Sequence, residues 1–121
     1  MSNHLPSELP PVVQSWFDQK GWTPHQHQIE MFARRGDPAT LLIAPTGCGK
    51  TMAGFLPSLA ALSEAPHLGM HTLYISPLKA LAADIKRNLR VPVEQMGLDI
   101  RIEDRTGDTS PTQKRRQRSD P

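Results

Sequence analysis

The chain has 121 residues, of which 37% are hydrophobic and 5% aromatic, so it offers at most one small domain with limited burial. Its formal net charge of +2 is too small to indicate a nucleic-acid-binding protein from charge alone. The single cysteine, Cys48, excludes an internal disulfide, and no apolar run has the length of a membrane span or a signal peptide. We therefore expect a cytoplasmic protein with no membrane partner.

Two short helices are predicted within residues 1–36. The second follows Thr23-Pro24, which would supply an N-cap and a proline at the first helical position, and it ends near Gly36. The first has apolar residues at helical spacing, namely Val12, Val13, Trp16 and Phe17. Residues 1–36 are therefore interpreted as a helical N-terminal segment.

Residues 40–51 combine a strand with a loop that can bind phosphate. The run from Thr40 to Ala44 is apolar without alternation, which is typical of a strand in a parallel sheet covered on both faces. The loop that follows ends in Gly-Lys-Thr and leads into a predicted helix. Backbone N–H groups at such a helix N-terminus attract the phosphates of a nucleotide.

The residues of this loop have separate roles. Gly47 and Gly49 can adopt a positive φ, which lets the backbone approach the phosphates. Lys50 can reach the β- and γ-phosphates, and the Thr51 hydroxyl can bind the Mg²⁺ that bridges them. The general pattern G-x-x-x-x-G-K-[ST] has glycine where this chain has Ala44, so the match is imperfect. The alternative is a glycine-rich turn without a ligand.

Helices and strands are predicted to alternate beyond this loop. The helix after residue 49 contains Pro57, which should kink it, and Val91-Pro92 should end the later helix that begins at residue 78. A separate short helical segment is expected at residues 93–96, with Gly97 as its cap. We expect strands at residues 71–76 and 98–103, and a strongly polar helix after Ser110. This order predicts βαβ units and a parallel sheet, with the phosphate loop and the turns after residue 76 and at 106–109 converging at one edge.

Basic residues are concentrated after the phosphate loop, whereas the first forty residues are slightly acidic. The last predicted helix contains the cluster Lys114, Arg115, Arg116 and Arg118. We interpret this cluster as exposed helix surface, with contact to nucleic acid as the alternative.

Three stretches resemble motifs of superfamily 2 helicases. Residues 44–51, Ala-Pro-Thr-Gly-Cys-Gly-Lys-Thr, resemble motif I, which in that superfamily commonly begins with alanine. Residues 23–26 resemble the Q-motif, and residues 74–82 resemble motif Ia. The amino-acid sequence of residues 76–84, together with Arg-Thr-Gly-Asp-Thr at 105–109, is similar to that of the Lhr (large helicase-related) proteins and their ligase-associated DExH-box branch.

This resemblance implies an α/β fold, namely a partial RecA-like P-loop NTPase domain with a parallel sheet and flanking helices. That domain would occupy residues 37–121 and stop before Walker B, after the helical segment 1–36 with its Q-motif-like stretch. The implied function is the ATP-binding N-terminal part of an ATP-dependent DNA helicase or translocase in DNA repair. The implied cofactors are ATP and Mg²⁺, and the implied partners are single-stranded DNA and DNA ligase or exonuclease associates.

The resemblance also assigns site residues. Lys50 and Thr51 would be catalytic, Thr51 would bind Mg²⁺, and Gln26 would read the adenine, although a solvated helix glutamine is an equal alternative. The ATP site would comprise Gln26, Thr46, Gly47, Cys48, Gly49, Lys50 and Thr51. The nucleic-acid contacts would be Pro77, Lys79, Thr106, Gly107, Asp108 and Thr109.

The family has later elements that these 121 residues lack, namely the Walker B Asp-Glu and a second RecA-like domain with an arginine finger. We therefore expect the isolated chain to be poorly stable and without measurable ATPase activity. The remaining alternatives are a DEAD-box-like RNA helicase, a P-loop phosphotransferase for a small substrate, and a non-catalytic nucleotide-binding remnant.

Overall fold

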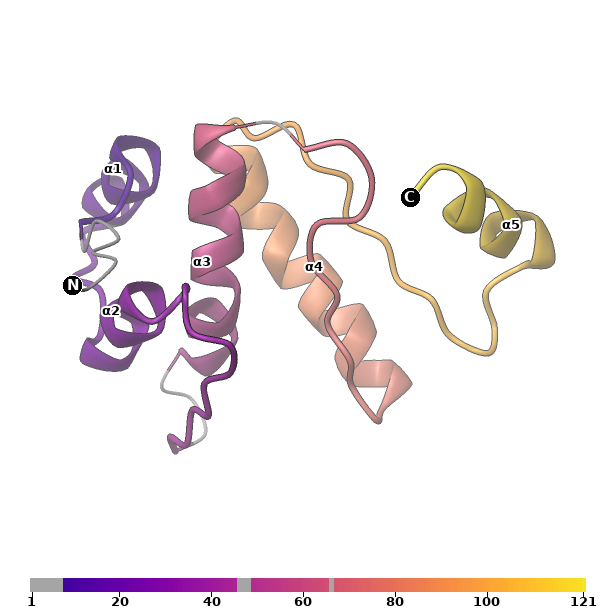
Figure 1. Cartoon of the computed structure of the whole chain (residues 1–121), viewed down its shortest axis with the longest axis horizontal. Coiled ribbons are helices and arrows are strands. Elements are labelled where there is room, and N and C mark those ends of the chain that lie inside the picture. Colours follow the sequence, from indigo (N-terminus) through magenta and orange to yellow (C-terminus); the bar gives the residue numbers. More distant parts are fainter. Residues whose placement is uncertain (1–7, 46–48, 66) are drawn as a thin grey trace. The chain divides into compact units, whose positions relative to one another are not determined.

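The computed structural model describes residues 8–45, 49–65 and 67–121. The chain divides into two compact units, Met1–Ala65 and Pro66–Pro121. The described residues form five α-helices joined by irregular segments, as Figure 1 shows. No helix in the described ranges has both the length and the apolar composition that crossing a lipid bilayer requires.

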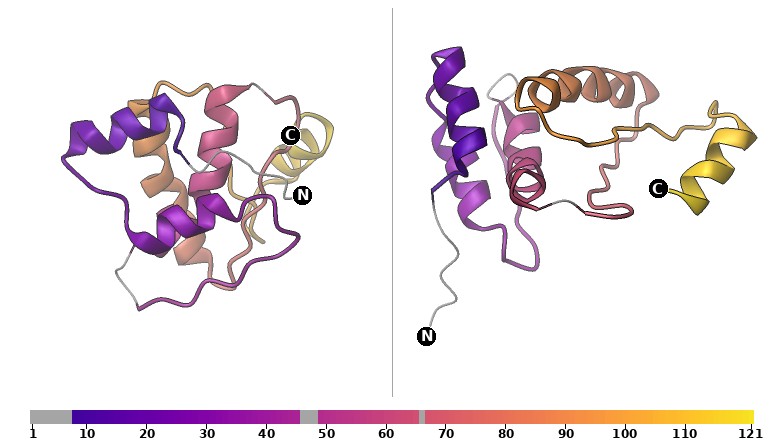
Figure 2. Two further views of the ribbon diagram at one scale, coloured as in Figure 1. Left: turned by 60° about the vertical axis from the view of Figure 1, so that its left-hand side comes forward. Right: turned by 90° about the horizontal axis from the view of Figure 1, so that it is seen from above.

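The first unit is a cluster of three helices. These are α1 (Pro11–Lys20), α2 (Gln26–Ala33) and α3 (Lys50–Glu64), and α3 packs against both of the others (Figure 2). The largest fully buried side chains are Val13, Phe32 and Leu56, one from each helix. Burial of such a side chain stabilises a fold by about 1.5–3 kcal/mol relative to exposure. The core of this unit therefore lies where the three helices meet, and α3 continues through Pro57 to Glu64.

The second unit contains α4 (Lys79–Gln95) and α5 (Pro111–Ser119), with an irregular segment at 98–106 between them. Its buried residues among those described are Pro92 and Val93, both in α4. The prediction that α4 would end at Pro92 is wrong, because the helix runs three residues further. Burial of Pro92 and Val93 offsets the hydrogen bond that a proline cannot donate. Gly97, with φ 70°, follows the last turn.

The predicted parallel sheet is not confirmed. Residues 40–45, 71–76 and 98–103 have no strand assignment, and no strand occurs in the described parts of the chain. A strand exists only when a neighbouring strand pairs with its backbone N–H and C=O groups, and no described segment forms such a ladder with these three. Apolar side chains in two of the segments are accordingly exposed, with Ile43 at 84% and Ile75 at 82%.

Candidate functional site

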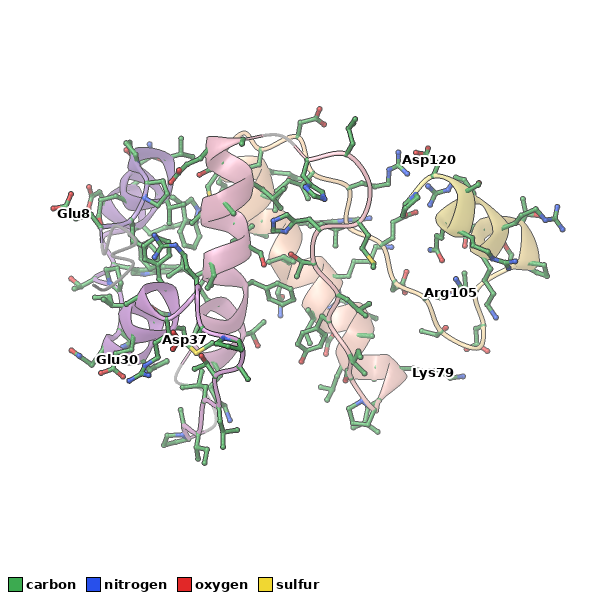
Figure 3. All side chains as sticks on the ribbon, in the orientation of Figure 1. Glu8, Glu30, Asp37, Lys79, Arg105 and Asp120 are labelled. Atoms are coloured by element: carbon green, nitrogen blue, oxygen red, sulfur yellow. The ribbon has the colours of Figure 1, made fainter. Side chains whose placement is uncertain are left out.

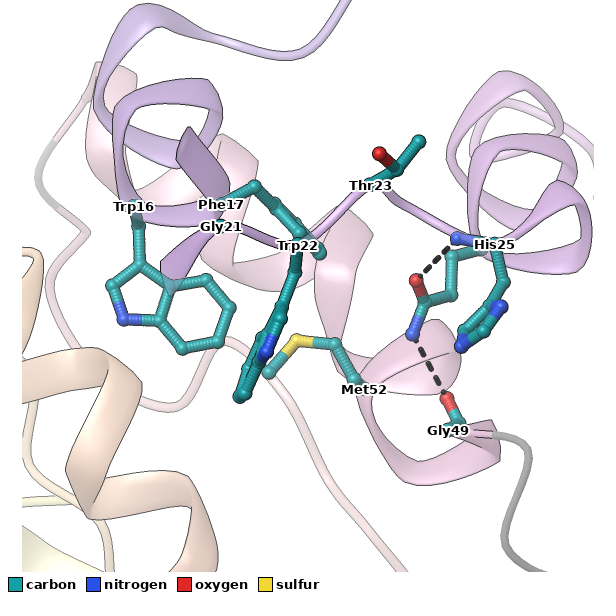
Figure 4. A pocket seen from close by; sticks show the side chains of 9 residues that line it. Trp16, Phe17, Gly21, Trp22, Thr23, His25, Gly49 and Met52 are labelled. Atoms are coloured by element: carbon teal, nitrogen blue, oxygen red, sulfur yellow. Dashed lines mark hydrogen bonds between the residues drawn. The ribbon is translucent and has the colours of Figure 1, made fainter. Parts of the chain in front are cut away.

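A pocket of about 490 Å³ opens on the first unit, between the end of α1 and the starts of α2 and α3 (Figure 4). Its lining combines aromatic rings, a methionine, a polar amide and two glycines. These residues are Trp16, Phe17, Gly21, Trp22, Thr23, His25, Gln28, Gly49 and Met52.

One wall of the pocket is formed by Trp22, whose side chain is 55% exposed. The ring of Trp16 meets the ring of Trp22 edge to face, with centroids 5.6 Å apart and an interplanar angle of 84°. The ammonium of Lys20 lies 5.7 Å from the Trp22 ring and 6.0 Å from the Trp16 ring. Both contacts restrain the Trp22 indole, so a flat aromatic ligand can stack on a wall that is already in place.

The turn at the end of α1 places Trp22. Gly21 adopts a left-handed conformation with φ 70°, and its N–H donates to the carbonyl oxygen of Asp18. The N–H of Trp22 donates to the carbonyl oxygen of Phe17 at 3.0 Å. These two bonds form a helix C-terminal motif that favours glycine at its first position. The Lys-Gly-Trp sequence therefore directs the indole back over α1.

The Gln28 side chain connects the start of α2 to the start of α3. Its Oε1 accepts from the backbone N–H of His25 at 2.8 Å, and its Nε2 donates to the carbonyl oxygen of Gly49 at 3.3 Å (Figure 4). The side chain is 4% exposed. Because each end of the amide has a fixed partner, the oxygen and the nitrogen cannot exchange places.

Gly49 adopts a backbone conformation that favours glycine. Its φ is 74°, in the positive range that the sequence indicates a glycine can adopt here, and a Cβ built on it would lie 2.7 Å from Nε2 of Gln28. A side chain at position 49 would therefore be strained and would also displace Gln28.

Two of the predicted phosphate ligands are described beside this glycine. Lys50 and Thr51 open α3, and both are exposed. The predicted ATP-site residues Thr46, Gly47 and Cys48 lie outside the described residues.

Gln26, the predicted adenine reader, does not line the pocket. It is exposed, and its amide donates to Oε1 of Glu30 at 3.3 Å. The sequence prediction placed the N-cap of α2 at Thr23, which is wrong, because the N-cap is His25 in an extended conformation. With this cap, Gln28 is the third residue of the helix, where a capping-box glutamine reaches back to the cap N–H. With the cap placed correctly at His25, the sequence predicts this capping role of Gln28.

In the second unit, Lys79 and the turn at 106–109 lie together. The Lys79 ammonium is 2.9 Å from Oδ2 of Asp108. Within the turn, the N–H of Thr106 donates to Oγ1 of Thr109 at 2.9 Å, and the N–H of Asp108 donates to Oγ1 of Thr106 at 3.1 Å. Gly107 has open space at its Cβ position and no positive φ. The structure therefore joins two of the predicted nucleic-acid elements, and Pro77 precedes Lys79 by two residues.

Charged contacts hold the segment before this turn. Nζ of Lys86 in α4 lies 3.1 Å from Oδ1 of Asp104, and this hydrogen bond holds the pKa of the Asp104 carboxyl below its ordinary value. On the other side, Arg116 of α5 pairs with Glu103, and the Gln117 amide donates to the carbonyl oxygen of Asp104 at 3.0 Å. The segment is thus tied to both helices by polar groups.

Mg²⁺ has one predicted protein ligand here, the hydroxyl of Thr51. In the described residues, no group of three histidine, cysteine or acidic side chains is placed to hold a metal ion. This donor set fits a cation that is carried mainly by phosphate oxygens and water, as Mg²⁺ is in nucleotide complexes.

Residues 23–120 match the family model of the DEAD/DEAH box helicases. The chain is 39% identical over 118 residues to the "Lhr helicase/probable uracil glycosylase" of Mycolicibacterium smegmatis, with 86% of this chain and 8% of that protein covered. It is 35% identical over 122 residues to the "ATP-dependent helicase Lhr-Core" of Saccharolobus solfataricus, with 89% and 14% covered. The structure of Mycobacterium smegmatis helicase Lhr bound to ssDNA and AMP-PNP matches with a TM-score of 0.83 and 35% identity, over 93% of this chain and 16% of that chain. The chain therefore spans a small part of the length of these relatives.

Proposed function

The chain belongs to the DEAD/DEAH box helicase family, and from this premise we propose that it supplies the adenine and phosphate contacts of an ATP-dependent helicase of the Lhr type. One observation carries the proposal. The aromatic and amide pocket of the first unit shares Gly49 with the end of the phosphate loop. A nucleotide bound by the loop therefore has a site for its base beside it.

Gln28 is the proposed adenine reader in place of Gln26. An amide oxygen has two lone pairs and an amide nitrogen has two hydrogens, and Gln28 uses one of each in the bonds to His25 and Gly49. The remaining lone pair and hydrogen match the N6 donor and N7 acceptor of adenine, a pairing that glutamine also makes in nucleic-acid recognition. Because the amide is held at both ends, guanine would present an acceptor where Gln28 requires a donor. We therefore expect ATP to bind more tightly than GTP.

Trp22 and the start of α3 complete the proposed site. The exposed indole of Trp22 offers a stacking surface for the base. Lys50 and Thr51 stand at the N-terminus of α3, where the helix dipole favours the β- and γ-phosphates. The Thr51 hydroxyl would bind Mg²⁺, and the bound Mg²⁺ would neutralise part of the phosphate charge. The contacts of Thr46, Gly47 and Cys48 with the phosphates stay predictions.

The second unit is proposed to contact single-stranded DNA through Pro77, Lys79 and residues 106–109. Hydroxyl and backbone groups at a turn, together with a lysine, bind phosphates without reading bases. The Lhr structure that this chain resembles contains ssDNA and AMP-PNP, which supports both parts of the proposal. A role in DNA repair, a cytoplasmic location and ligase or exonuclease associates are proposed from the family likeness.

Tryptophan fluorescence tests the nucleotide site. Titration of the chain with MgATP should quench the emission, because the base stacks on Trp22, and MgGTP should do so only at higher concentration. Trp22→Phe should remove most of the signal change, and Lys50→Ala should weaken MgATP binding while the quench at saturation remains. Equal affinity for MgATP and MgGTP would show that Gln28 does not read adenine.

A second experiment tests which nucleic acid the chain binds. The affinities for single-stranded DNA and for single-stranded RNA of the same sequence are compared in the same buffer, and tighter binding of DNA is expected.

A further inference from the structure

The basic cluster on α5 separates into two faces in the structure. Arg116 and Gln117 point toward the 98–106 segment, where they contact Glu103 and the carbonyl oxygen of Asp104. The side chains of Lys114, Arg115 and Arg118 form no ion pair or hydrogen bond with any described residue. We call these three residues the α5 cationic face. The Arg116 side chain therefore helps to hold the 98–106 segment against α5, whereas the side chains of the other three residues make no polar contact within the described chain.

Most carboxylates of the second unit are already paired with other cations. The pairs are Asp84 with Arg87, Asp104 with Lys86, Asp108 with Lys79, Glu103 with Arg116, and Asp120, labelled in Figure 3, with Arg101. Each of these cations has a carboxylate within 4.0 Å, and none of these carboxylates reaches the α5 cationic face. The positive charge of this face is thus uncompensated.

Helix geometry brings the three cations together. Lys114 and Arg118 are four residues apart, and Arg115 and Arg118 are three apart, so each pair is adjacent on the helix surface. Like charges at these spacings destabilise an isolated helix by about 0.2–0.5 kcal/mol per pair. The helix has no buried residue to offset this repulsion. A bound polyanion would remove the repulsion and stabilise α5.

We infer that the α5 cationic face binds the phosphates of single-stranded nucleic acid, in addition to the contacts proposed for Lys79 and residues 106–109. This inference rests on the proposed function, in which the second unit contacts DNA. The face begins about one helical turn after the 106–109 turn, so a strand held at the turn has these cations beside it. The helix sequence PTQKRRQRS has no apolar residue beyond its first proline, so a protein partner would find no hydrophobic anchor. Phosphates need only the cations.

The test compares two double variants that lose the same charge. Arg115→Gln with Arg118→Gln removes two members of the face, and Arg34→Gln with Arg87→Gln removes two exposed arginines that are paired with aspartates. Binding of a fluorescein-labelled oligothymidylate to the 121-residue chain is followed by anisotropy across a salt series. Circular dichroism checks that both variants keep the helix content of the unaltered chain.

We expect the α5 double variant to bind about 25-fold more weakly at 0.1 M salt, with a salt slope shallower by about 1.4, because each lost phosphate contact removes about 0.7 from the slope for a single strand. The control pair should change affinity by less than about threefold. Arg115→Lys with Arg118→Lys should bind like the unaltered chain, because lysine retains the charge. If the glutamine variant loses helix content, the lysine variant shows whether its weaker binding comes from the lost charge or from the lost helix.

Three outcomes would overturn the inference. If the α5 double variant binds as tightly as the control pair while the unaltered chain binds normally, the face has no role and the proposed function stands. If the unaltered chain does not bind the oligonucleotide, the inference and the DNA contacts of the proposed function fail together. If poly-glutamate displaces the oligonucleotide at equal charge concentration, the face binds acidic polymers in general and its assignment to nucleic acid is wrong.

Discussion

Replacement of Gln28 by alanine tests the connection between α2 and the phosphate loop. The substitution removes the 2.8 Å bond from the His25 N–H and the 3.3 Å bond to the Gly49 carbonyl oxygen. Each such bond contributes about 1 kcal/mol net, and loss of a helix cap costs about 0.5–2 kcal/mol. The side chain is 4% exposed, so water does not replace these contacts fully. We expect the free energy of unfolding of the first unit to fall by about 2 kcal/mol.

The same substitution should weaken MgATP binding. A bidentate amide contact with adenine discriminates by about 1–3 kcal/mol, so the dissociation constant should rise about tenfold or more. Gln28→Glu separates the two effects, because a carboxylate still accepts from the His25 N–H but cannot donate to Gly49 or to adenine. It should bind MgATP as weakly as Gln28→Ala and unfold at a higher urea concentration than that variant.

Gln26→Ala is the matched control, because it removes an exposed glutamine from the same helix. Its single side-chain bond to Glu30 is worth about 0.2–0.5 kcal/mol, so neither unfolding nor binding should change appreciably. Urea denaturation followed by tryptophan emission gives the stability, and the MgATP titration gives the affinity. The reasoning is refuted if Gln26→Ala weakens MgATP binding and Gln28→Ala leaves it unchanged.

Three further predictions concern single positions. Asp108→Asn frees the Lys79 ammonium from the carboxylate 2.9 Å away, so oligothymidylate should bind more tightly in low salt, and unchanged anisotropy titrations would contradict this. Because Lys86 lowers the pKa of Asp104, the pair stabilises the second unit above the ordinary carboxyl pKa of about 4, and this contribution is lost as pH falls through the lowered pKa. Asp104→Asn should therefore flatten the acid limb of a stability profile measured by circular dichroism. Gly49→Ala, at φ 74°, should destabilise the first unit by about 1–2 kcal/mol in urea titrations.

The helices were predictable because their signals are local. Apolar spacing and proline or glycine punctuation indicated all five helices of the described chain, and Gly97 was expected to cap the helical stretch that forms the end of α4. The errors fall at helix ends. The extended His25, and not Thr23, caps α2, and burial keeps Pro92 inside α4. In both cases the local preference of a single residue, Thr23 for a cap position or Pro92 for a helix end, was overridden by the contacts of residues near it.

The predicted sheet could not be derived from local signals as the helices could. The apolar run at 40–44 has the composition of a buried strand, yet a strand is a property of two segments, and composition describes one. In the candidate site, too, some features follow from a local motif and others depend on contacts that the sequence does not show directly. The freedom of Gly49 to adopt a positive φ followed from its motif, whereas the proposal of Gln28 in place of Gln26 as the adenine reader depends on the cap of α2, which the sequence did not place correctly.

The exposed side chains at Leu41, Ile43, Leu73 and Ile75 have a practical consequence. Short apolar stretches with high β-propensity and unpaired backbone groups are templates for cross-β stacking between molecules. The purified chain should therefore self-associate as its concentration rises and form inclusion bodies on overexpression, through these stretches and not through its helical surfaces. A charged residue at Ile43 or Ile75 would act as a gatekeeper against this without touching the nucleotide pocket.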